Sequence, residues 1–381
     1  MQKYSSDLDY LLNQLESIHP DLYRFYSKEK FYNDIDILKK KNIVDNKDFC
    51  FEIMRLLAKL KDSHTCIIPN VNAVFELKLI NNEFYIVDDY KNKNSSYKYK
   101  KIKNINKVPV EQIRKKIDEF IAYDVEEWEK SRIEIYLLCE ELLKYIGIVK
   151  DDFLIELDDG TLIDYNKELK KDYIIECLNY FENRKIDDSY YIKYGVCKGM
   201  NNIDLDSWFD SIIKDLKKYE PYNIIIDLRG NAGGNSKYFT SFSKKLSKEF
   251  DDMNYIVITD NGTFSSGIFA LEEMIKLGAI HIGTSVGACK NHYGNIKLIK
   301  LSNCDITINC SDSYWVLKDN SFIGLNSEEI KSFADKKLLY NMEKIIPDIV
   351  IEKSLDDYIN GTDCVLDFAI EYQKINPRIK R

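Results

Sequence analysis

The feature that most constrains the fold of this chain is an alternation of apolar and amphipathic runs between residues 187 and 283. The apolar runs are short and continuous, as in NIIIDL, YIVITD and AIHIG. The runs between them carry apolar residues at helical spacing, as in DLDSWFDSIIKDLKKY. Strands that are apolar on both faces are typical of parallel sheets covered by helices. The sequence therefore predicts an α/β domain built on a parallel sheet.

The residues before this region predict two smaller modules. Residues 5–62 carry apolar residues at helical spacing and predict a helical cap. Residues 66–100 contain the β-like runs CIIP, AVFELKLI and EFYIVDD, and a second long helix is predicted at 125–147. Asp159–Gly160 lies between alternating apolar residues and predicts a hairpin. The predicted domains are a helical cap at 1–65, an inserted mixed α/β module at 66–168 and an α/β core at 169–381.

Composition narrows the range of functions. The net charge is −8, which argues against binding of nucleic acid, because such binding needs a basic surface. The nine cysteines are odd in number and form no CxxC pair, which favours reduced thiols over a disulfide framework or a zinc site. No signal peptide is visible, and no apolar run approaches the length of about 18 residues that spans a membrane. We therefore expect a cytoplasmic protein with no transmembrane helix, or an exported one if a signal segment has been trimmed from the sequence.

Two loops follow predicted strands of the α/β core. DLRGNAGGNS follows the strand at 223–228, and DNGTFSSG follows the strand at 255–260. In parallel α/β sheets, ligands bind at the carboxyl ends of the strands, in the loops that lead to helices. If the two strands are neighbours, the two loops face each other across one crevice.

The first loop holds Gly230, Gly233 and Gly234, which allow positive φ angles and a close approach of main-chain N–H groups to a ligand. A phosphate cradle is one interpretation, but no Lys-Ser/Thr pair follows and the GxGxxG spacing is absent. A tight turn before a helix is the second interpretation. The third is an oxyanion hole, in which main-chain donors stabilise a charge that forms on a carbonyl oxygen.

The second loop places Ser265 at the start of a predicted helix, where free N–H groups and the helix dipole favour negative charge. Ser265 could attack a carbonyl there, with the amide of Ser266 stabilising the oxyanion. The same position suits a simple helix cap, which is the commoner role of a serine. A nucleophilic serine needs a partner that takes its proton, so the hypothesis requires a base.

The candidate bases are four histidines and one lysine. His19 in a helix turn and His281 in a strand are typical of structural histidines. His292 lies near the second loop in sequence, and His64 lies where the cap ends. Lys290 is a further candidate, since a desolvated lysine beside a serine can be neutral at physiological pH. Residue types alone do not select among them.

Four segments resemble, in the same order, the C-terminal processing (tail-specific) serine proteases together with the tricorn-protease core. The first, LLAKLKDSHTCI, is similar to the Asp-x-His-Thr signature of a histidine-using branch, and the second, NIIIDLRGNAGGNS, is similar to an Asp-Leu-Arg-x-Asn-x-Gly-Gly strand and turn. The third, GTFSSGIFALEEMIKLGAIHIGTSVG, is similar to the segment that carries the nucleophile. The fourth, IIPDIVIEKSLDDYINGTDCVLDFAIEY, is similar to the closing segment of the family. The resemblance covers nearly the whole chain. It implies an α/β core of the ClpP/crotonase-like βα superhelix type, with an N-terminal helical cap and an inserted small α+β module.

The resemblance also implies roles for individual residues. Ser265 matches the nucleophile, and His64 matches the general base of the histidine-using branch. Gly233 and the amide of Ser266 match the oxyanion hole. Glu343, shortly before a Pro-Asp pair, is the nearest candidate for the acid that orients the histidine.

Lys290 remains the alternative base. The bacterial processing proteases use a serine–lysine dyad with the lysine 25 residues after the nucleophile, and Lys290 lies at that spacing from Ser265. However, the stretch GTSVGACKNHYGN is more similar to the glycine-rich stretch of the histidine-using branch. We therefore favour His64.

The function that the resemblance implies is a serine endopeptidase that acts on a peptide or protein substrate and needs no metal or cofactor. Two alternatives remain open: a catalytically incomplete member that binds extended peptides, and another serine acyl-transfer reaction such as ester hydrolysis or peptide ligation. Within the inserted module, YKKIKNINKVPVEQIRKKI resembles the strand and helix of a PDZ-like peptide-binding module but lacks its corner glycines.

Overall fold

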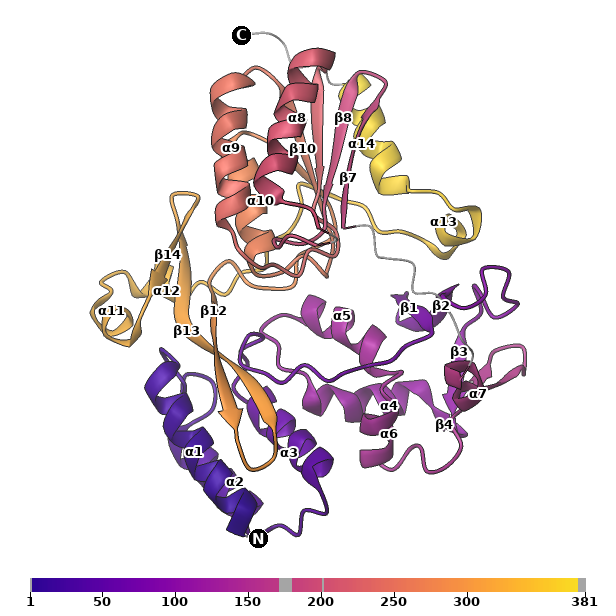
Figure 1. Ribbon diagram of the computed structural model, residues 1–381, viewed down its shortest axis with the longest axis vertical. Helices are drawn as coiled ribbons and strands as arrows, with labels where there is room; N and C mark the ends of the chain where they lie inside the picture. Colours follow the sequence, from indigo (N-terminus) through magenta and orange to yellow (C-terminus); the bar gives the residue numbers. More distant parts are fainter. Residues whose placement is uncertain (1, 171–179, 201, 376–381) are drawn as a thin grey trace. The chain divides into compact units, whose positions relative to one another are not determined.

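The structure is a computed structural model that describes residues 2–170, 180–200 and 202–375 (Figure 1). The chain forms two compact units. The first unit comprises Met1–Glu176, Asn291–Val316 and Ile323–Asn341, and the second comprises Cys177–Lys290, Leu317–Phe322 and Met342–Arg381. Each unit therefore draws on segments that are far apart in the sequence.

A six-stranded sheet forms the centre of the second unit. In spatial order its strands are β15 (Ile349–Val350), β11 (Ile280–Gly283), β10 (Asn254–Thr259), β9 (Asn223–Asp227), β8 (Ser189–Tyr194) and β7 (Phe181–Ile186). Neighbouring strands are parallel except β7 and β8, which form an antiparallel hairpin. The predicted α/β architecture with parallel pairing is confirmed, and β7 is an addition that the sequence analysis did not anticipate.

Helices cover both faces of this sheet (Figure 1). On one side lie α8 (Leu205–Tyr219), α9 (Lys237–Glu249) and α10 (Ser266–Lys276), and on the other lies α14 (Cys364–Ile375), which follows the short α13 (Leu355–Asn360). The apolar face predicted for α8 is buried. The start of α14 packs on the sheet through apolar side chains of both elements: Val365, Leu366 and Ala369 against Ile225, Ile256, Ile258 and Ile282.

Three helices form the N-terminal part of the first unit, as predicted for residues 5–62. They are α1 (Gln2–Ile18), α2 (Lys28–Lys40) and α3 (Asn46–Ala58). The side chains of Ser27 and Asp45 accept main-chain N–H groups in the first turns of α2 and α3 and so fix where these helices begin. The leucines at helical spacing in α1 are buried: Leu8, Leu11, Leu12 and Leu15.

The segment after α3 mixes strands and helices. β1 (Phe75–Ile80) and β2 (Glu83–Asp89) form a hairpin. A second sheet has the order β4 (Val108–Pro109), β3 (Ile102–Ile105), β5 (Leu154–Leu157) and β6 (Leu162–Asp164). The helices of this segment are α4 (Val110–Ile117), α5 (Glu126–Tyr136), α6 (Glu140–Tyr145) and α7 (Tyr165–Lys170), with a 3-10 turn at Asp118–Phe120.

Two predictions for this segment are wrong in detail. The long helix expected at 125–147 is two helices, because the chain leaves helical geometry at 137–139 and buries these residues in the core. The run CIIP is not a strand, although Cys66 exchanges two main-chain hydrogen bonds with Asn309. The hairpin expected at Asp159–Gly160 is present between β5 and β6.

Residues 292–325 form a three-stranded sheet that the sequence analysis did not anticipate. Its strands are β12 (His292–Leu301), β13 (Ile306–Lys318) and β14 (Ser321–Leu325), with β13 in the middle. Apolar side chains of β12 and β13, among them Ile299 and Ile308, are buried in the same cluster as those of α1 and α3. This shared burial explains why residues 291–316 group with the first unit, although the sequence analysis assigned them to the core at 169–381. Two short helices follow, α11 (Ser327–Ser332) and α12 (Lys336–Leu339).

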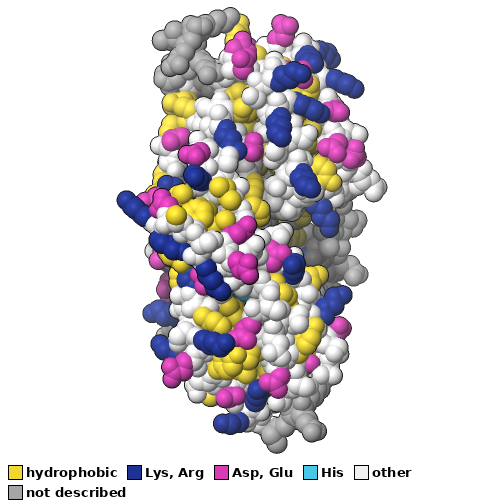
Figure 2. All heavy atoms as spheres, turned by 90° about the vertical axis from the view of Figure 1, so that its left-hand side faces the viewer, with side chains coloured by type: hydrophobic (Ala, Val, Ile, Leu, Met, Phe, Trp, Pro, Cys, Tyr) yellow, Lys and Arg dark blue, Asp and Glu magenta, His cyan; other side chains and the backbone are white. Residues whose placement is uncertain are grey.

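Basic and acidic side chains are interspersed over the face shown in Figure 2, as the mixed charges of the sequence indicate. Across the described ranges, no helix combines the length and the apolar character that a membrane span requires.

Candidate active site

The two loops singled out in the sequence meet at one edge of the sheet in the second unit. β9 and β10 are adjacent and parallel, as expected, so the loops that follow them leave the sheet at the same edge. Hydrogen bonds of 2.8 Å join the loops: Thr263 Oγ1 to Leu228 O, Gly230 N to Asp260 Oδ1, Phe264 N to Asn231 O, and Ser266 Oγ to Gly234 O. The loops therefore support each other rather than standing as independent turns.

Ser265 occupies the N-cap position of α10 but does not behave as an ordinary cap. Its φ of 53° and ψ of −125° are strained for a residue with a Cβ, whereas ordinary N-cap residues have β-region angles. Its hydroxyl makes no capping hydrogen bond to the described residues of α10. A strained strand-to-helix turn that presents a serine is typical of nucleophile sites. The geometry of Ser265 is therefore that of a strained turn and not of an ordinary helix cap.

The main-chain amide of Ser266 is the first of α10. Its neighbours are engaged, because Gly267 N donates to Phe264 O and Ile268 N donates to Ser265 O, both at 2.9 Å. A first-turn N–H has no acceptor within its own helix, and the helix dipole adds partial positive charge there. The hydroxyl of Ser266 donates to Gly234 O and so serves the structure of the loops.

Gly233 lies directly against the serine pair. A Cβ built on Gly233 would lie 2.6 Å from Ser265 Cβ, 3.0 Å from Ser265 Oγ and 2.9 Å from Ser266 N. Gly233 also has a φ of 101°, which glycine adopts at no steric cost. The predicted nucleophile and both predicted oxyanion donors therefore meet at one point of the second unit.

Asn231 is a buried residue of this site that the sequence analysis did not single out. Its Oδ1 accepts the N–H of Gly233 at 2.9 Å, and its Nδ2 donates to Tyr194 O at 2.6 Å. In this structure the Gly233 amide is thus engaged by a side chain. An asparagine that bonds the main chain two residues later forms an Asx turn, so its place before the glycine pair was the available signal.

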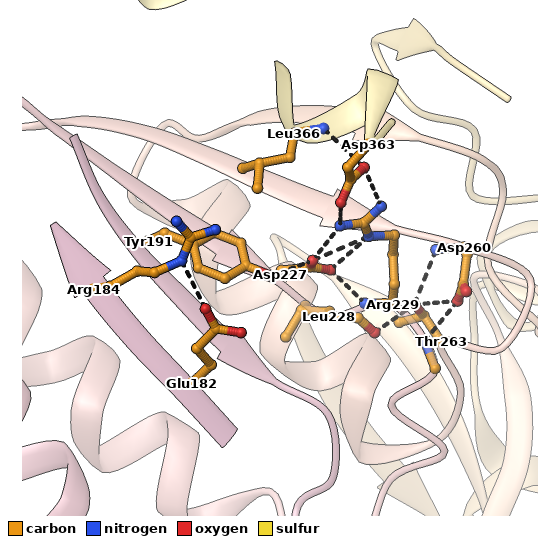
Figure 3. A network of polar contacts seen from close by, with 11 residues as sticks. Glu182, Arg184, Tyr191, Asp227, Leu228, Arg229, Asp260, Thr263, Asp363 and Leu366 are labelled. Carbon is orange, nitrogen blue, oxygen red and sulfur yellow. Dashed lines mark hydrogen bonds and ion pairs between the residues drawn. The ribbon is translucent and has the colours of Figure 1, made fainter. Parts of the chain in front are cut away.

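Arg229 anchors the first loop to the start of α14 (Figure 3). Its guanidinium donates to both oxygens of Asp227 and to both oxygens of Asp363, and the hydroxyl of Tyr191 also donates to Asp227. Asp363 in turn accepts the N–H of Leu366 in α14. Burial disfavours the charge of Arg229, but the two carboxylates outweigh this effect and raise the pKa of Arg229.

We expect Arg229→Lys to lower the free energy of unfolding by about 1.5–3 kcal/mol, since a lysine cannot form two forked pairs at once. Urea unfolding of the variant and the wild type measures the loss. Arg184→Lys is the matched control, because Arg184 pairs with Glu182 at the surface and should lose no more than about 1 kcal/mol. Equal losses for the two variants would contradict the anchoring role.

Lys290 and Glu343 pair with each other in the second unit. Lys290 Nζ lies 2.8 Å from Glu343 Oε2, and Lys290 N also donates to Glu343 O at 2.9 Å. The two side chains are 38% and 68% exposed. A lysine that acts as a base must be desolvated, whereas Lys290 is partly exposed and pairs with an acidic side chain.

His64 belongs to the first unit, in the turn that follows α3. Asp62 Oδ1 accepts the N–H of His64 at 2.8 Å, and Ser311 on β13 binds the same turn through Asp62 and Thr65. The imidazole of His64 stacks on that of His292, with 6.0 Å between ring centroids and 14° between planes. Hydrogen bonds on both sides of His64 thus fix its main chain.

Burial strongly affects the pKa values of His64 and Asp62. It lowers the pKa of His64 to about 4, against the opposing effect of the Asp62 charge. Burial alone would raise the pKa of Asp62, but the hydrogen bond from His19 and the charges of His19 and His64 lower it to about 2. His64 is therefore a neutral imidazole beside an ionised carboxylate at physiological pH.

The other histidines make structural contacts. His19 Nε2 lies 3.2 Å from Asp62 Oδ2 in the first unit. His281 in β11 binds Thr259 through Nε2 at 2.7 Å, and burial lowers the pKa of His281 to about 4. His281 therefore serves the sheet, as its place in the sequence indicated.

The eight cysteines within the described residues are thiols and form no disulfide. Among the same residues, no group of three or more His, Cys, Asp and Glu side chains is arranged to hold a metal ion.

Comparisons with known proteins give matches in three dimensions. No family model matches the chain, and no curated protein matches its sequence. The crystal structure of mature CPAF matches with a TM-score of 0.69 at 10% identity, covering 99% of each chain, and mature CPAF complexed with lactacystin matches with the same values. The photosystem II D1 C-terminal processing protease matches with a TM-score of 0.50 at 10% identity, covering 91% of this chain and 93% of that one.

These likenesses extend over both units. They confirm, at the level of the fold, the resemblance read from the four sequence segments. The chain has the fold of CPAF and of the photosystem II D1 C-terminal processing protease.

Proposed function

We propose that this chain is a serine endopeptidase that cleaves peptide bonds through an acyl-enzyme, with Ser265 as the nucleophile. The observation that carries the proposal is the strained turn at Ser265, with the main chain of Gly233 and the amide of Ser266 beside its hydroxyl. The fold shared with a C-terminal processing protease supports the same reaction class.

In the proposed reaction, Ser265 Oγ attacks the carbonyl carbon of the substrate while the base takes the hydroxyl proton. The bond to the leaving nitrogen then breaks as the base returns that proton to the amine. Water hydrolyses the ester with the same base. The N–H groups of Ser266 and Gly233 stabilise the oxyanion, and the oxyanion competes with Asn231 Oδ1 for the Gly233 hydrogen.

We assign the base to His64, with Lys290 as the alternative. A neutral imidazole held by its main chain suits a proton acceptor, whereas Lys290 is ion-paired. Glu343 remains the proposed acid that orients the imidazole of His64. In that role, Glu343 must give up its ion pair with Lys290 and bind the imidazole instead. Lys290→Ala should leave most activity in place, while His64→Ala should remove it.

The decisive test is labelling of the purified wild-type protein with a fluorophosphonate, followed by mass spectrometry of the labelled peptide. Modification of Ser265 together with cleavage of a peptide library supports the proposal. Modification at another serine, or none, refutes it. Analysis of the products separates peptide cleavage from ester hydrolysis and from ligation.

A peptide-binding protein without catalysis is the second candidate. The observation that favours it is the hydrogen bond from Gly233 N–H to Asn231 Oδ1, which occupies one of the two oxyanion donors. Peptide binding by wild-type protein that resists fluorophosphonate would select this candidate.

The activity should depend on the protonation of His64. A protonated imidazole cannot accept the serine proton, so kcat/KM should stay high down to about pH 5. It should fall as pH drops through about 4, well below the value of about 6.5 for an ordinary histidine. A profile of kcat/KM from about pH 3.5 to 8, with circular dichroism to verify folding at each pH, measures this limb. A fall in kcat/KM centred near pH 6.5 would contradict the assignment of a buried, neutral imidazole as the base.

Three finer assignments belong to the same proposal. The second unit is of the ClpP/crotonase-like type, supported by its parallel strands with helices on both faces. The segment at 66–168 is a PDZ-like module, supported by its short sheet together with α4. It lies in the sequence between a proposed cap at 1–65 and a proposed core at 169–381. The protein acts in the cytoplasm on peptides or proteins, supported by the thiol state of its described cysteines.

A further inference from the structure

The carboxylate of Asp62 is the hub of a buried hydrogen-bond network in the first unit. Asp62 is 1% exposed. Its Oδ1 accepts the N–H of His64 at 2.8 Å, and its Oδ2 accepts the hydroxyl of Ser311 at 2.7 Å and a hydrogen bond from His19 at 3.2 Å. These donors come from three parts of the chain: the turn after α3, strand β13 and the segment after α1.

The contacts of His19 define its tautomer. Asp21 N donates to Nδ1 of His19 at 3.1 Å, so Nδ1 carries a lone pair. In the neutral ring the proton is then on Nε2, the atom that faces Asp62. His19 thus donates to Asp62 through Nε2. The Tyr293 ring packs on His19 with 4.6 Å between centroids and fixes its orientation.

The Asp62 carboxylate therefore accepts hydrogen bonds from a main-chain N–H, a hydroxyl and an imidazole. Cys66 and Cys310 face this charge, and burial together with the Asp62 carboxylate raises the pKa of each thiol. At Tyr293, burial and the charge of Asp21 raise the pKa of the phenol, Arg24 opposes them, and Asp62 adds a smaller effect. On the imidazole side, His64 has Asp62 in its own turn and His292 on β12. A buried carboxylate that keeps its charge favours a positive charge on the neighbouring ring.

We propose that Asp62 is the positioning residue of His64: it holds the main chain of His64 and supplies a fixed negative charge beside the imidazole, and His19 keeps that carboxylate in place. This inference rests on the proposed function, in which His64 accepts the proton of Ser265. An imidazolium forms in that step, and Asp62 stabilises it without touching the substrate. The arrangement differs from a triad in which a carboxylate bonds the ring nitrogen directly.

The test compares Asp62→Asn with the wild type in the full chain. We expect Asp62→Asn to lower kcat by about 10²-fold with KM nearly unchanged. It should also lower the pKa of His64 by about 1 unit, measured by NMR titration of the four histidines. An unchanged pKa of His64 in Asp62→Asn would overturn the proposal.

The matched control is Ser311→Ala, which removes one donor to Asp62 but keeps its charge. It should change kcat by less than about 10-fold and leave the pKa of His64 in place. His19→Gln, which retains a donor, should recover the activity that His19→Ala loses. Equal losses in all these variants would indicate a purely structural network and overturn the proposal.

Two readouts keep the inference independent of folding and of catalysis. If Asp62→Asn does not fold, carbon-13 titration of the Asp62 carboxyl in the wild type decides: a pKa near 2 supports the proposal, and a pKa above about 5 overturns it. If the wild type resists fluorophosphonate, the proposed function fails. A drop in the pKa of His64 in Asp62→Asn would still establish the role of Asp62.

Discussion

Ser265→Ala is expected to lower kcat for peptide cleavage by a factor on the order of 10⁶ and to remove fluorophosphonate labelling. The loss follows from the absence of the attacking oxygen, which no neighbouring group replaces. The variant should fold normally, because the Ser265 hydroxyl makes no capping hydrogen bond within the described part of α10. Stopped and continuous peptide assays, with thermal unfolding as the check on folding, measure both effects.

Ser266→Ala is the matched control for this prediction. Ser266 differs from Ser265 in what its hydroxyl does, because it donates to Gly234 O and leaves only the main-chain amide for the oxyanion. Losing one neutral hydrogen bond costs about 1 kcal/mol, so activity should fall by about 10-fold or less. If Ser266→Ala were as inactive as Ser265→Ala, the assignment of the nucleophile would be wrong.

Gly233→Ala should have the second largest effect, a loss of at least about 10³-fold in kcat. The new methyl group would lie 2.6 Å from Ser265 Cβ and 2.9 Å from Ser266 N, so the nucleophile, the amide or both must move. A displaced donor costs about 10²–10³ in rate, and a misplaced nucleophile adds to this. Steady-state kinetics and the rate of fluorophosphonate labelling test the prediction.

Gly230→Ala is the control that distinguishes two effects of an alanine in this loop: the contact of its methyl group with Ser265, and the main-chain strain at a positive φ. Gly230 also has a positive φ, of 71°, but a Cβ there meets no atom within 4 Å among the described residues. Alanine at both positions should therefore cost about 1–2 kcal/mol of stability through main-chain strain. Only Gly233→Ala should also lose activity. Comparable kinetics for the two variants would show that strain, not the approach to Ser265, limits the loop.

Much of the second unit could be predicted from its residues alone. The apolar runs at β9, β10 and β11 and the helical period of α8 identify the parallel sheet, because burial on both faces leaves a continuous apolar pattern. The same reasoning places two loops at one edge of the sheet. The strain at Ser265 could not be predicted, since it depends on how the loop after β10 is held by Leu228, Asn231 and Gly234.

The first unit was harder to predict because its contacts are distant in sequence. β12 and β13 were missed, since their partners in the core, α1 and α3, lie more than two hundred residues earlier. The sequence analysis identified Asp62 only as the first residue of the Asp-x-His-Thr signature. Its donors His19 and Ser311 come from other segments, so no local pattern identifies the network.

The shared core of α1, α3, β12 and β13 has a consequence for synthesis of the protein on the ribosome. The two helices are complete by Ala58, but β12 ends only at Leu301. At translation rates of about 5–20 residues per second, the nascent helices wait roughly 10–50 s for the strands that cover them. During that interval their apolar side chains are open to chaperones, and the first unit cannot finish folding until the second has largely been made.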